Sequence, residues 1–342
     1  MIVRARAPLR LSFGGGGTDL SPFSDIHGGC IINATIDKYA YATIELTDNN
    51  KVELVSADQQ IIIEYSLDQT LNSLTNEKLP LHLATYNRFI SQYNDNQPIA
   101  LKLTTYSDVL PGSGLGSSST LVVAMVKAFT ELLNLPLGEY EIAQHAYAIE
   151  RLEVKFKGGK QDQYAAAFGG FNFIEFQKDR VTVNPLKIKN WIVCELEASL
   201  LLFYTGISRA SDTIIAEQTK NLETNEAQSM QAMQQLKQDA ITMKKSILKG
   251  DFKSFGSLLD NSWQAKKLTA KNITNEKLEN IYNAAKAAGA KGAKISGAGG
   301  GGFMMFYMDP SKRKDVMQAL EGFEGSFYNC HFTKKGCEAW RL

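Results

Sequence analysis

Residues 111–119 constrain the fold of this chain more than any other segment, and they read Pro-Gly-Ser-Gly-Leu-Gly-Ser-Ser-Ser. The next residues, 120–134, carry apolar side chains at positions 121, 122, 125, 126, 129, 132 and 133, which is the spacing of an α-helix. We therefore predict a glycine-rich loop that leads into the N-terminus of a helix. Such a terminus presents unpaired N–H groups and the positive end of the helix dipole, and both favour a bound phosphate.

Three consecutive serine hydroxyls stand where this helix is predicted to begin, and they can reach a magnesium ion held by the phosphate. The segment therefore predicts a site for a nucleoside triphosphate. The residues predicted to bind the nucleotide are Pro111, Gly112, Ser113, Gly114, Leu115, Gly116, Ser117, Ser118 and Ser119.

Other nucleotide-binding patterns are missing from the sequence. Neither G-x-x-x-x-G-K-[ST] nor the protein-kinase sequences H-R-D and D-F-G occur. One match to G-x-G-x-x-G falls at Gly297, Gly299 and Gly302. A dinucleotide-binding fingerprint follows a strand and opens a helix, whereas these glycines are predicted to follow a helix and precede a strand. We therefore exclude a dinucleotide site at this position.

Length and composition fit an ordinary globular protein of two domains, because 342 residues is about twice a typical domain. We place the boundary near residue 190, which gives domains of 1–190 and 191–342. A net charge of +1 provides no field for nucleic acid or an anionic membrane surface. The four cysteines are scattered, and no apolar run approaches the length of a membrane helix. We expect a cytoplasmic protein that binds neither nucleic acid nor a membrane.

Periodicity predicts a mixture of strands and helices, so the fold class is α+β. Strands are expected at 1–13, 31–47, 52–65, 100–106, 171–176, 199–204, 303–308 and 326–333. Helices are expected at 80–94, 120–134, 138–154, 161–168, 209–249, 251–265, 275–288 and 311–321.

Three glycine-containing motifs occur in a fixed order, at residues 8–19, 111–119 and 294–302. In this order and spacing they resemble the GHMP kinase superfamily, which includes galactokinase, homoserine kinase, mevalonate kinase and phosphomevalonate kinase. The resemblance covers nearly the whole chain. It implies an N-terminal domain with a left-handed βαβ unit, a C-terminal ferredoxin-like domain, and an active site in the cleft between them that uses ATP and Mg²⁺.

The first motif separates substrates within the superfamily. Alignment on Arg10 and Asp19 places Gly16 and Gly17 where galactokinases carry a Glu-His pair that contacts the far end of a hexose. Two glycines there suit a sugar that is longer or carries its own phosphate. This motif, together with residues 158–170, looks like the D-glycero-D-manno-heptose 7-phosphate kinases, and residues 204–210 are similar to their matching segment.

This likeness implies phosphorylation of the anomeric hydroxyl of a heptose 7-phosphate, in nucleotide-activated heptose synthesis for surface polysaccharide. Two alternatives stay open. The first alternative is another sugar-1-kinase, such as fucokinase or galactokinase, because fucokinases also carry G-G-x-T-D in the first motif. A non-catalytic sugar sensor with the same fold is the second. The oligomeric state is not fixed by the sequence, and a homodimer is compatible with it.

The resemblance implies that Asp162 is the general base and that Arg10 stabilises the transferred phosphate or the ionised base. A guanidinium suits that role because it stays charged and donates through a planar fork. The structural alternative for Asp162 is an N-cap of the helix at 161–168. The alternative for Arg10 is a surface position at the end of a strand.

The resemblance also implies that Ser118 and Glu150 hold magnesium. A carboxylate with phosphate oxygens and water is a common ligand set for this ion. The alternative for Glu150 is an exposed helix carboxylate paired with Arg151 or Lys155. The third glycine motif is expected to pack against the serine loop, since glycines allow a close approach of backbones.

The sugar phosphate is expected to contact the first motif and nearby cations. Asp19 would bond to sugar hydroxyls, with a turn-forming role as the alternative. Arg209 is the preferred phosphate ligand because its fork can bond bidentately, and Lys157 and Lys160 are further candidates. All three cations could equally be solvated surface charges. The predicted substrate-binding residues are Gly16, Gly17, Thr18, Asp19, Lys160 and Arg209.

Overall fold

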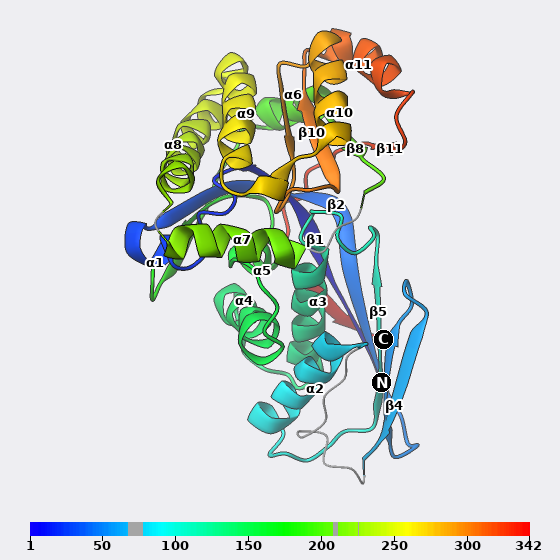
Figure 1. Ribbon diagram of the computed structural model, residues 1–342. Coiled ribbons are helices and arrows are strands. Elements are labelled where there is room, and N and C mark those ends of the chain that lie inside the picture. Colours follow the sequence, from blue (N-terminus) through cyan, green and yellow to red (C-terminus); the bar gives the residue numbers. More distant parts are fainter. Residues whose placement is uncertain (68–77, 208–210, 225) are drawn as a thin grey trace.

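The computed structural model describes residues 1–67, 78–207, 211–224 and 226–342, and its strands form two sheets (Figure 1). The larger sheet has the order β12-β1-β2-β5-β3-β4, and β6 pairs with β2 and β7. Its pairs are antiparallel except β3 and β5, which run parallel and are joined through β4 and the helix α2. The strands are β1 (Ile2–Gly14), β2 (Gly29–Leu46), β3 (Lys51–Ser56), β4 (Ile61–Ser66), β5 (Leu101–Ser107), β6 (Phe171–Phe176), β7 (Val181–Pro185) and β12 (Glu338–Arg341).

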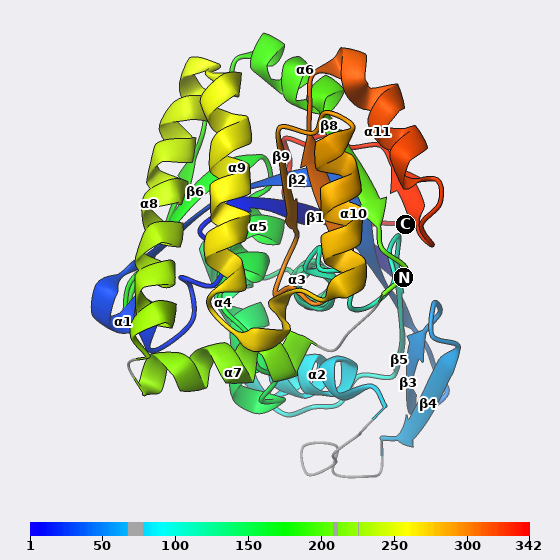
Figure 2. The ribbon, with the colours of Figure 1, turned by 45° about the horizontal axis from the view of Figure 1, so that its top comes forward.

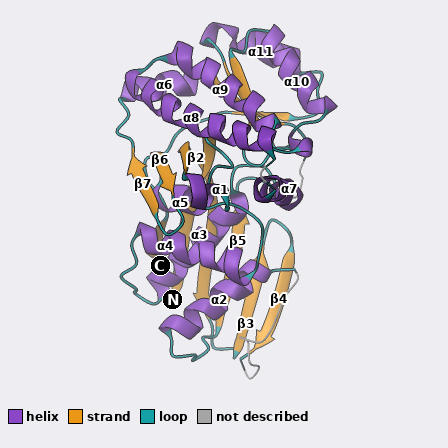
Figure 3. Cartoon of the chain, turned by 60° about the vertical axis from the view of Figure 1, so that its left-hand side comes forward, coloured by secondary structure: helices purple, strands orange, loops and turns teal. Residues whose placement is uncertain are grey.

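Helices of the N-terminal half cover one face of this sheet (Figure 3). The central one, α3, packs on β1 and β2. Its side chains Val122, Met125 and Phe129 are fully buried, as the helical spacing predicted, and each such burial contributes roughly 1.5–3 kcal/mol. The helical segments are α1 (Phe23–His27), α2 (Pro80–Tyr93), α3 (Ser117–Leu132), α4 (Glu139–Tyr147), the π-helical turn Ala148–Glu153 and α5 (Gln161–Phe168).

The smaller sheet has the order β11-β8-β10-β9 with all pairs antiparallel. Numbered along the chain this order is 4-1-3-2 in a βαββαβ arrangement, which confirms the ferredoxin-like C-terminal domain. Helices α9 and α10 pack on its strand β9, and α8 lies beside α9 and packs on β1 and β2 of the larger sheet (Figure 2). Its elements are α6 (Asn190–Ser199), β8 (Leu200–Tyr204), α7 (Ser211–Glu223), α8 (Ala227–Lys249), α9 (Phe252–Lys267), Lys271–Ile273, α10 (Glu276–Ala287), β9 (Gly292–Ile295), β10 (Phe303–Tyr307), Pro310–Lys312, α11 (Arg313–Leu320) and β11 (Ser326–Tyr328).

Strand β1 connects the two halves and orients Arg10. Its pairing with β2 shifts register between Pro8 and Arg10, which marks a β-bulge. Leu9 and Leu11 are fully buried in a core shared with α8, α9 and β10. Because successive side chains of a strand point to opposite faces, Arg10 between them projects away from that core.

Several elements differ from the expectations: the run 52–65 forms two strands, β3 and β4, and helix α6 was not expected. The stretch 209–249 is not one helix, because α7 ends at Glu223 and the Glu226 side chain caps α8 by accepting from the N–H groups of Gln228 and Ser229. The third glycine motif follows strand β9 and not a helix; it still opens no helix, so the exclusion of a dinucleotide site stands.

The domain boundary near residue 190 stays a prediction, and α6 begins there. The end of the chain departs from that division, because β12 returns to the larger sheet and pairs with β1. Local periodicity carries no information about which sheet a terminal strand joins. The α+β class is confirmed. None of the helices among the described residues is long and apolar enough to cross a membrane.

Candidate active site

A cavity of about 260 Å³ opens where the two domains meet. It receives side chains or backbone from the three glycine motifs, the π-helical turn, and helices α5, α7 and α9. Its lining residues are Arg10, Gly17, Asp19, Leu20, Gly112, Gly114, Gly116, Ser117, Ser118, Ser119, Glu150, Arg151, Phe156, Lys157, Gly158, Gly159, Gln161, Asp162, Asp212, Ile215, Gln218, Lys266, Ser296, Gly297, Ala298, Gly299 and Gly301.

The glycine–serine loop presents the start of α3 to this cavity. Gly112, Gly114 and Gly116 have φ of 75°, 80° and 79°, the left-handed region that glycine adopts without a steric penalty. Helix α3 begins at Ser117, and no side chain caps its N-terminus. Its first N–H groups and the positive end of its dipole are thus available to an anion, as the sequence predicted.

Not every residue of the predicted nucleotide loop lines the cavity. Pro111, Ser113 and Leu115 do not. Leu115 is buried in the core, and its carbonyl accepts a hydrogen bond from the Arg10 backbone N–H at 3.2 Å. The Ser113 carbonyl accepts from the N–H of Phe303 at 2.9 Å. These two residues therefore fix the loop to its neighbours.

The third glycine motif packs directly against the loop. A Cβ on Gly114 would lie 2.4 Å from the Ser296 carbonyl oxygen, and one on Gly297 would lie 2.8 Å from the Gly114 carbonyl oxygen. Only glycine permits this approach. The motif also contributes Ser296, Gly297, Ala298, Gly299 and Gly301 to the cavity, so it both supports the loop and faces the ligand space.

Gly114→Ala is expected to lower the free energy of unfolding by about 1–3 kcal/mol and to raise the KM for ATP, because a side chain at φ +80° is strained and this one meets Ser296. Urea unfolding and steady-state kinetics measure both. Gly322→Ala is the matched control, since its Cβ would have no atom within 4 Å. Equal stability of the two variants would contradict the packing described above.

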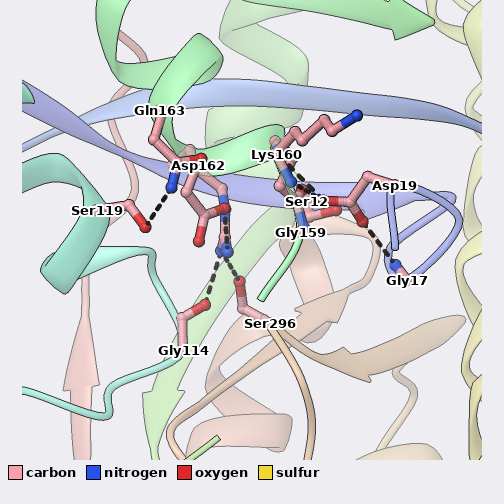
Figure 4. Close-up of polar contacts among 12 residues, drawn as sticks. Ser12, Gly17, Asp19, Gly114, Ser119, Gly159, Lys160, Asp162, Gln163 and Ser296 are labelled. Atoms are coloured by element: carbon pink, nitrogen blue, oxygen red, sulfur yellow. Dashed lines mark hydrogen bonds and ion pairs between the residues drawn. The ribbon is translucent and has the colours of Figure 1, made fainter. Parts of the chain in front are cut away.

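Asp162, labelled in Figure 4, forms an ion pair with Arg10 at the cavity. Arg10 Nε and Nη2 lie 2.8 Å and 2.7 Å from the same oxygen, Asp162 Oδ1. Arg10 Nη1 donates to the Gly114 carbonyl at 2.7 Å and to Ser296 Oγ at 3.2 Å. The guanidinium, only 2% exposed, thus ties all three glycine motifs and α5 together.

The second oxygen of Asp162, Oδ2, faces the loop and would lie 3.1 Å from a Cβ on Gly116. A carboxylate at this point can accept a proton from a hydroxyl group presented beside the helix terminus. The alternative role as N-cap is wrong, because Lys160 holds that position in α5 and no side chain caps it. The surface alternative for Arg10 is excluded by its burial.

Glu150 is buried beside Ser118 and Ser119. Its Oε1 accepts from Ser118 Oγ at 2.9 Å, and its Oε2 accepts from Ser119 Oγ at 2.6 Å and from Gln163 Nε2 at 2.7 Å. Arg151 Nη1 lies 3.3 Å from Oε1, so the expected pairing exists, but the carboxylate is 2% exposed and not at the surface. Ser119 therefore orients Glu150 and does not cap α3.

This donor set fits the predicted magnesium site. A hydroxyl and a carboxylate oxygen lie together on the cavity wall, beside the N-terminus where phosphates would supply further oxygens. Within the described ranges, no group of three or more His, Cys, Asp and Glu side chains could hold a metal alone. Glu150 also lies in a π-helical turn, a distortion frequent at functional sites.

Some residues of the first motif line the cavity, and others only hold the turn of the motif in place. Gly17 and Asp19 line the cavity. Asp19 Oδ2 accepts from the N–H groups of Lys160 and Gln161 at 2.9 Å and 3.0 Å, and burial raises its pKa. The Thr18 hydroxyl is buried and bonds to the backbone of Gly15 and Cys30, so Thr18 shapes the turn and is not part of the cavity lining. Gly16 is likewise outside the lining.

The predicted phosphate ligands lie in different places. Lys157 lines the cavity. The Lys160 ammonium lies 5.8 Å from the centre of the Tyr147 ring, and the residue lines a separate hollow. Its backbone N–H donates to Asp19 (Figure 4). Arg209 is outside the described residues.

Sequence reasoning missed Arg151 and Lys266. Arg151 lines the cavity and reaches the Gly159 carbonyl at 3.3 Å. Lys266 is buried on α9 and lines the same cavity. Neither lies in a glycine motif, and a lysine in an amphipathic helix resembles any solvated charge until the packing partner of that helix is known.

Comparison with known proteins agrees with this geometry. Residues 80–170 match the GHMP kinase N-terminal domain and residues 243–324 the GHMP kinase C-terminal domain. The chain is 45% identical over 341 residues to the D-glycero-alpha-D-manno-heptose 7-phosphate kinase of Campylobacter jejuni, with 99% of both covered. It is 27% identical over 346 residues to the L-fucokinase/L-fucose-1-P guanylyltransferase of Bacteroides fragilis, which covers 93% of this chain and 36% of that protein.

Among solved structures, a D-glycero-D-manno-heptose 1-phosphate kinase from Bacteroides thetaiotaomicron superposes with a TM-score of 0.83 at 42% identity, over 99% of each chain. Matches to both domain families, full-length identity well above 30%, and a shared fold agree. The chain belongs to the GHMP kinases, a family of ATP-dependent phosphotransferases.

Proposed function

We propose that this kinase transfers the γ-phosphoryl group of ATP to the anomeric hydroxyl of D-glycero-D-manno-heptose 7-phosphate and forms the 1,7-bisphosphate. The observation that carries the proposal is the Arg10–Asp162 pair, whose free carboxylate oxygen faces the helix terminus that would hold the triphosphate. The 45% identity to a heptose 7-phosphate kinase supports this choice of sugar. The product would enter nucleotide-activated heptose synthesis for surface polysaccharide.

In the proposed step, the sugar O1 forms a bond to the γ-phosphorus while the bond from that phosphorus to the β,γ-bridging oxygen breaks and ADP leaves. Asp162 Oδ2 accepts the proton of the hydroxyl. Arg10 holds Oδ1 in place through its Nε and Nη2 groups and so orients the carboxylate. Such reactions depend mainly on positioning and on stabilisation of phosphoryl charge, and Asp162 completes the set with a proton acceptor.

Groups of the chain itself would stabilise the negative charge of the ATP phosphates. The N–H groups at the start of α3 and its dipole would contact the phosphates. Glu150 and Ser118 would hold magnesium, which supplies charge neutralisation on the phosphate oxygens when bound. The roles of these residues rest on geometry and on the family resemblance together.

The names of two relatives differ in the position of the phosphate that the sugar carries. One relative is named a 7-phosphate kinase and one solved structure a 1-phosphate kinase. A sugar with a phosphate on O1 has no anomeric hydroxyl to react. We therefore propose the 7-phosphate as substrate, because the space beside Gly17, where galactokinases carry bulkier side chains, suits a longer sugar.

Two alternatives have weaker support. A fucokinase activity would follow the 27% match, but the identity is far below that to the heptose kinase. A non-catalytic sensor would not need the buried Arg10–Asp162 pair or the Glu150 network, and both are present.

The test measures ADP release with equal concentrations of heptose 7-phosphate, heptose 1-phosphate, unphosphorylated heptose, fucose and galactose. We expect the 7-phosphate to have by far the highest kcat/KM, with a new phosphate on C1 in the ³¹P spectrum of the product. Equal turnover of free fucose or galactose would overturn the assignment. A folded protein that binds ATP and phosphorylates none of the five would favour the sensor.

A further inference from the structure

Lys266 is a buried cation without a matching anion. It lies in the last turn of α9, and its side chain is 4% exposed. Its ammonium donates to the Gly16 carbonyl at 3.1 Å, and no ion pair among the described residues includes it. Burying an ammonium without a charged partner is costly, so its position calls for a functional reason.

The nearest carboxylate does not neutralise it. Asp19 lies close enough to raise the pKa of Lys266 electrostatically, but its oxygens accept from the N–H groups of Gly17, Lys160 and Gln161. A second buried lysine nearby, Lys294, donates to the carbonyls of Ser12 and Phe13. It does not line the cavity. Of these two buried lysines, Lys266 is the one whose charge faces the ligand space.

Its ammonium lies against the turn that follows β1, at Gly16 and Gly17. These two glycines stand where galactokinases contact the far end of a hexose, so the end of the sugar remote from its anomeric hydroxyl is expected at this part of the cavity. A Cβ on Gly17 would lie 3.0 Å from Lys266 Nζ, so the glycine leaves the ammonium uncovered toward the cavity.

We propose that Lys266 binds the phosphate that the sugar carries at the end remote from its anomeric hydroxyl, and that it thereby selects phosphorylated over free sugars. The inference rests on the proposed function. A phosphate monoester fits because it brings the missing negative charge and several acceptor oxygens to an ammonium with hydrogens to donate. Lys157 also lines the cavity and can add a second cation.

The test compares Lys266→Met with wild type on heptose 7-phosphate and on unphosphorylated heptose. Charge-assisted bonds of this kind correspond to about 10- to 150-fold in affinity. We therefore expect the KM for the 7-phosphate to rise by that factor, while the KM for ATP and the kcat/KM for free heptose change less than about twofold. Calorimetric titration of heptose 7-phosphate without ATP should show the same loss of affinity.

Lys267→Met is the matched control, because the neighbouring lysine pairs with Glu279 and does not line the cavity. It should leave both sugar constants unchanged. Circular dichroism confirms folding, and Lys266→Gln serves as a second neutral variant if the methionine variant is unstable. A wild-type enzyme inactive on heptose 7-phosphate removes the proposed function and this inference together. An active wild type with unchanged preference in the neutral variants removes only the inference.

The same residue predicts a pH dependence. Burial lowers the pKa of Lys266 to about 8, with Asp19 opposing that decrease. On neighbouring β9, Lys294 also has a pKa lowered by burial, to about 7, and Asp239 on α8 interacts with Lys294. Above pH 8 the free enzyme loses the Lys266 charge, so kcat/KM for heptose 7-phosphate should fall there. In Lys266→Met that falling limb should be absent, and its persistence would count against the proposal.

Discussion

Asp162→Asn is expected to lower kcat by roughly a hundred- to ten-thousandfold, because a positioned proton acceptor contributes about that much. The asparagine keeps the size of the side chain and can still accept from Arg10, but it cannot take the hydroxyl proton. The Kd for ATP should stay within about threefold of wild type, since the phosphate-binding N–H groups belong to the loop and α3. Single-turnover kinetics and a nucleotide titration measure the two quantities.

Asp179→Asn is the control for this variant, since it makes the same chemical change in the exposed turn after β6. It should leave kcat unchanged. If Asp162→Asn kept a near-normal rate while folded, Asp162 would not be the base, and positioning alone would account for catalysis. A parallel loss of ATP binding and rate would instead indicate that removal of the Arg10 partner had collapsed the loop.

Local sequence determined much of the loop and its helix. The glycines at 112, 114 and 116 and the apolar spacing of 120–134 predicted α3, its N-terminal loop and the anion site there. Such features depend on φ preferences and on a periodicity that any short window contains. The β10–α11–β11 unit was predicted for the same reason.

Features that depend on long-range packing could not be derived in this way. Arg10 and Asp162 are 152 positions apart, and their pairing was implied only by the family resemblance. The return of β12 to β1 and the break between α7 and α8 were missed. Lys266 shows the same limit, because its burial against the turn after β1 is a property of domain packing and not of α9 itself.

Thr18 and Lys160 illustrate a second limit. Both lie in motifs shared with sugar kinases. The Thr18 hydroxyl nevertheless bonds to the backbone of its own turn, and the Lys160 ammonium lies over the Tyr147 ring. A motif indicates which segment approaches a ligand. Which of its side chains does so depends on the direction of each Cα–Cβ bond, and that direction follows from turn geometry.

Glu150→Gln is expected to lower kcat/KM by on the order of a hundredfold and to raise the magnesium concentration that gives half-maximal rate. A neutral amide binds the ion weakly, and the loss of charge stabilisation on the phosphates is several kcal/mol at most. Glutamine can still bond to Ser118, Ser119 and Gln163, so folding should persist. The magnesium titration is the decisive measurement, because a purely structural role would change stability without shifting it.

Glu153→Gln provides the comparison within the same π-helical turn. Glu153 pairs with Arg88 at the surface and is absent from the cavity lining, so its loss should alter neither the rate nor the magnesium requirement. If Glu150→Gln showed an unchanged magnesium dependence, the ion would be held by other groups and Glu150 would serve only to fix the two serine hydroxyls. If the dependence shifts as expected, the pairing of Ser118 with a buried carboxylate is the feature that couples the start of α3 to the metal.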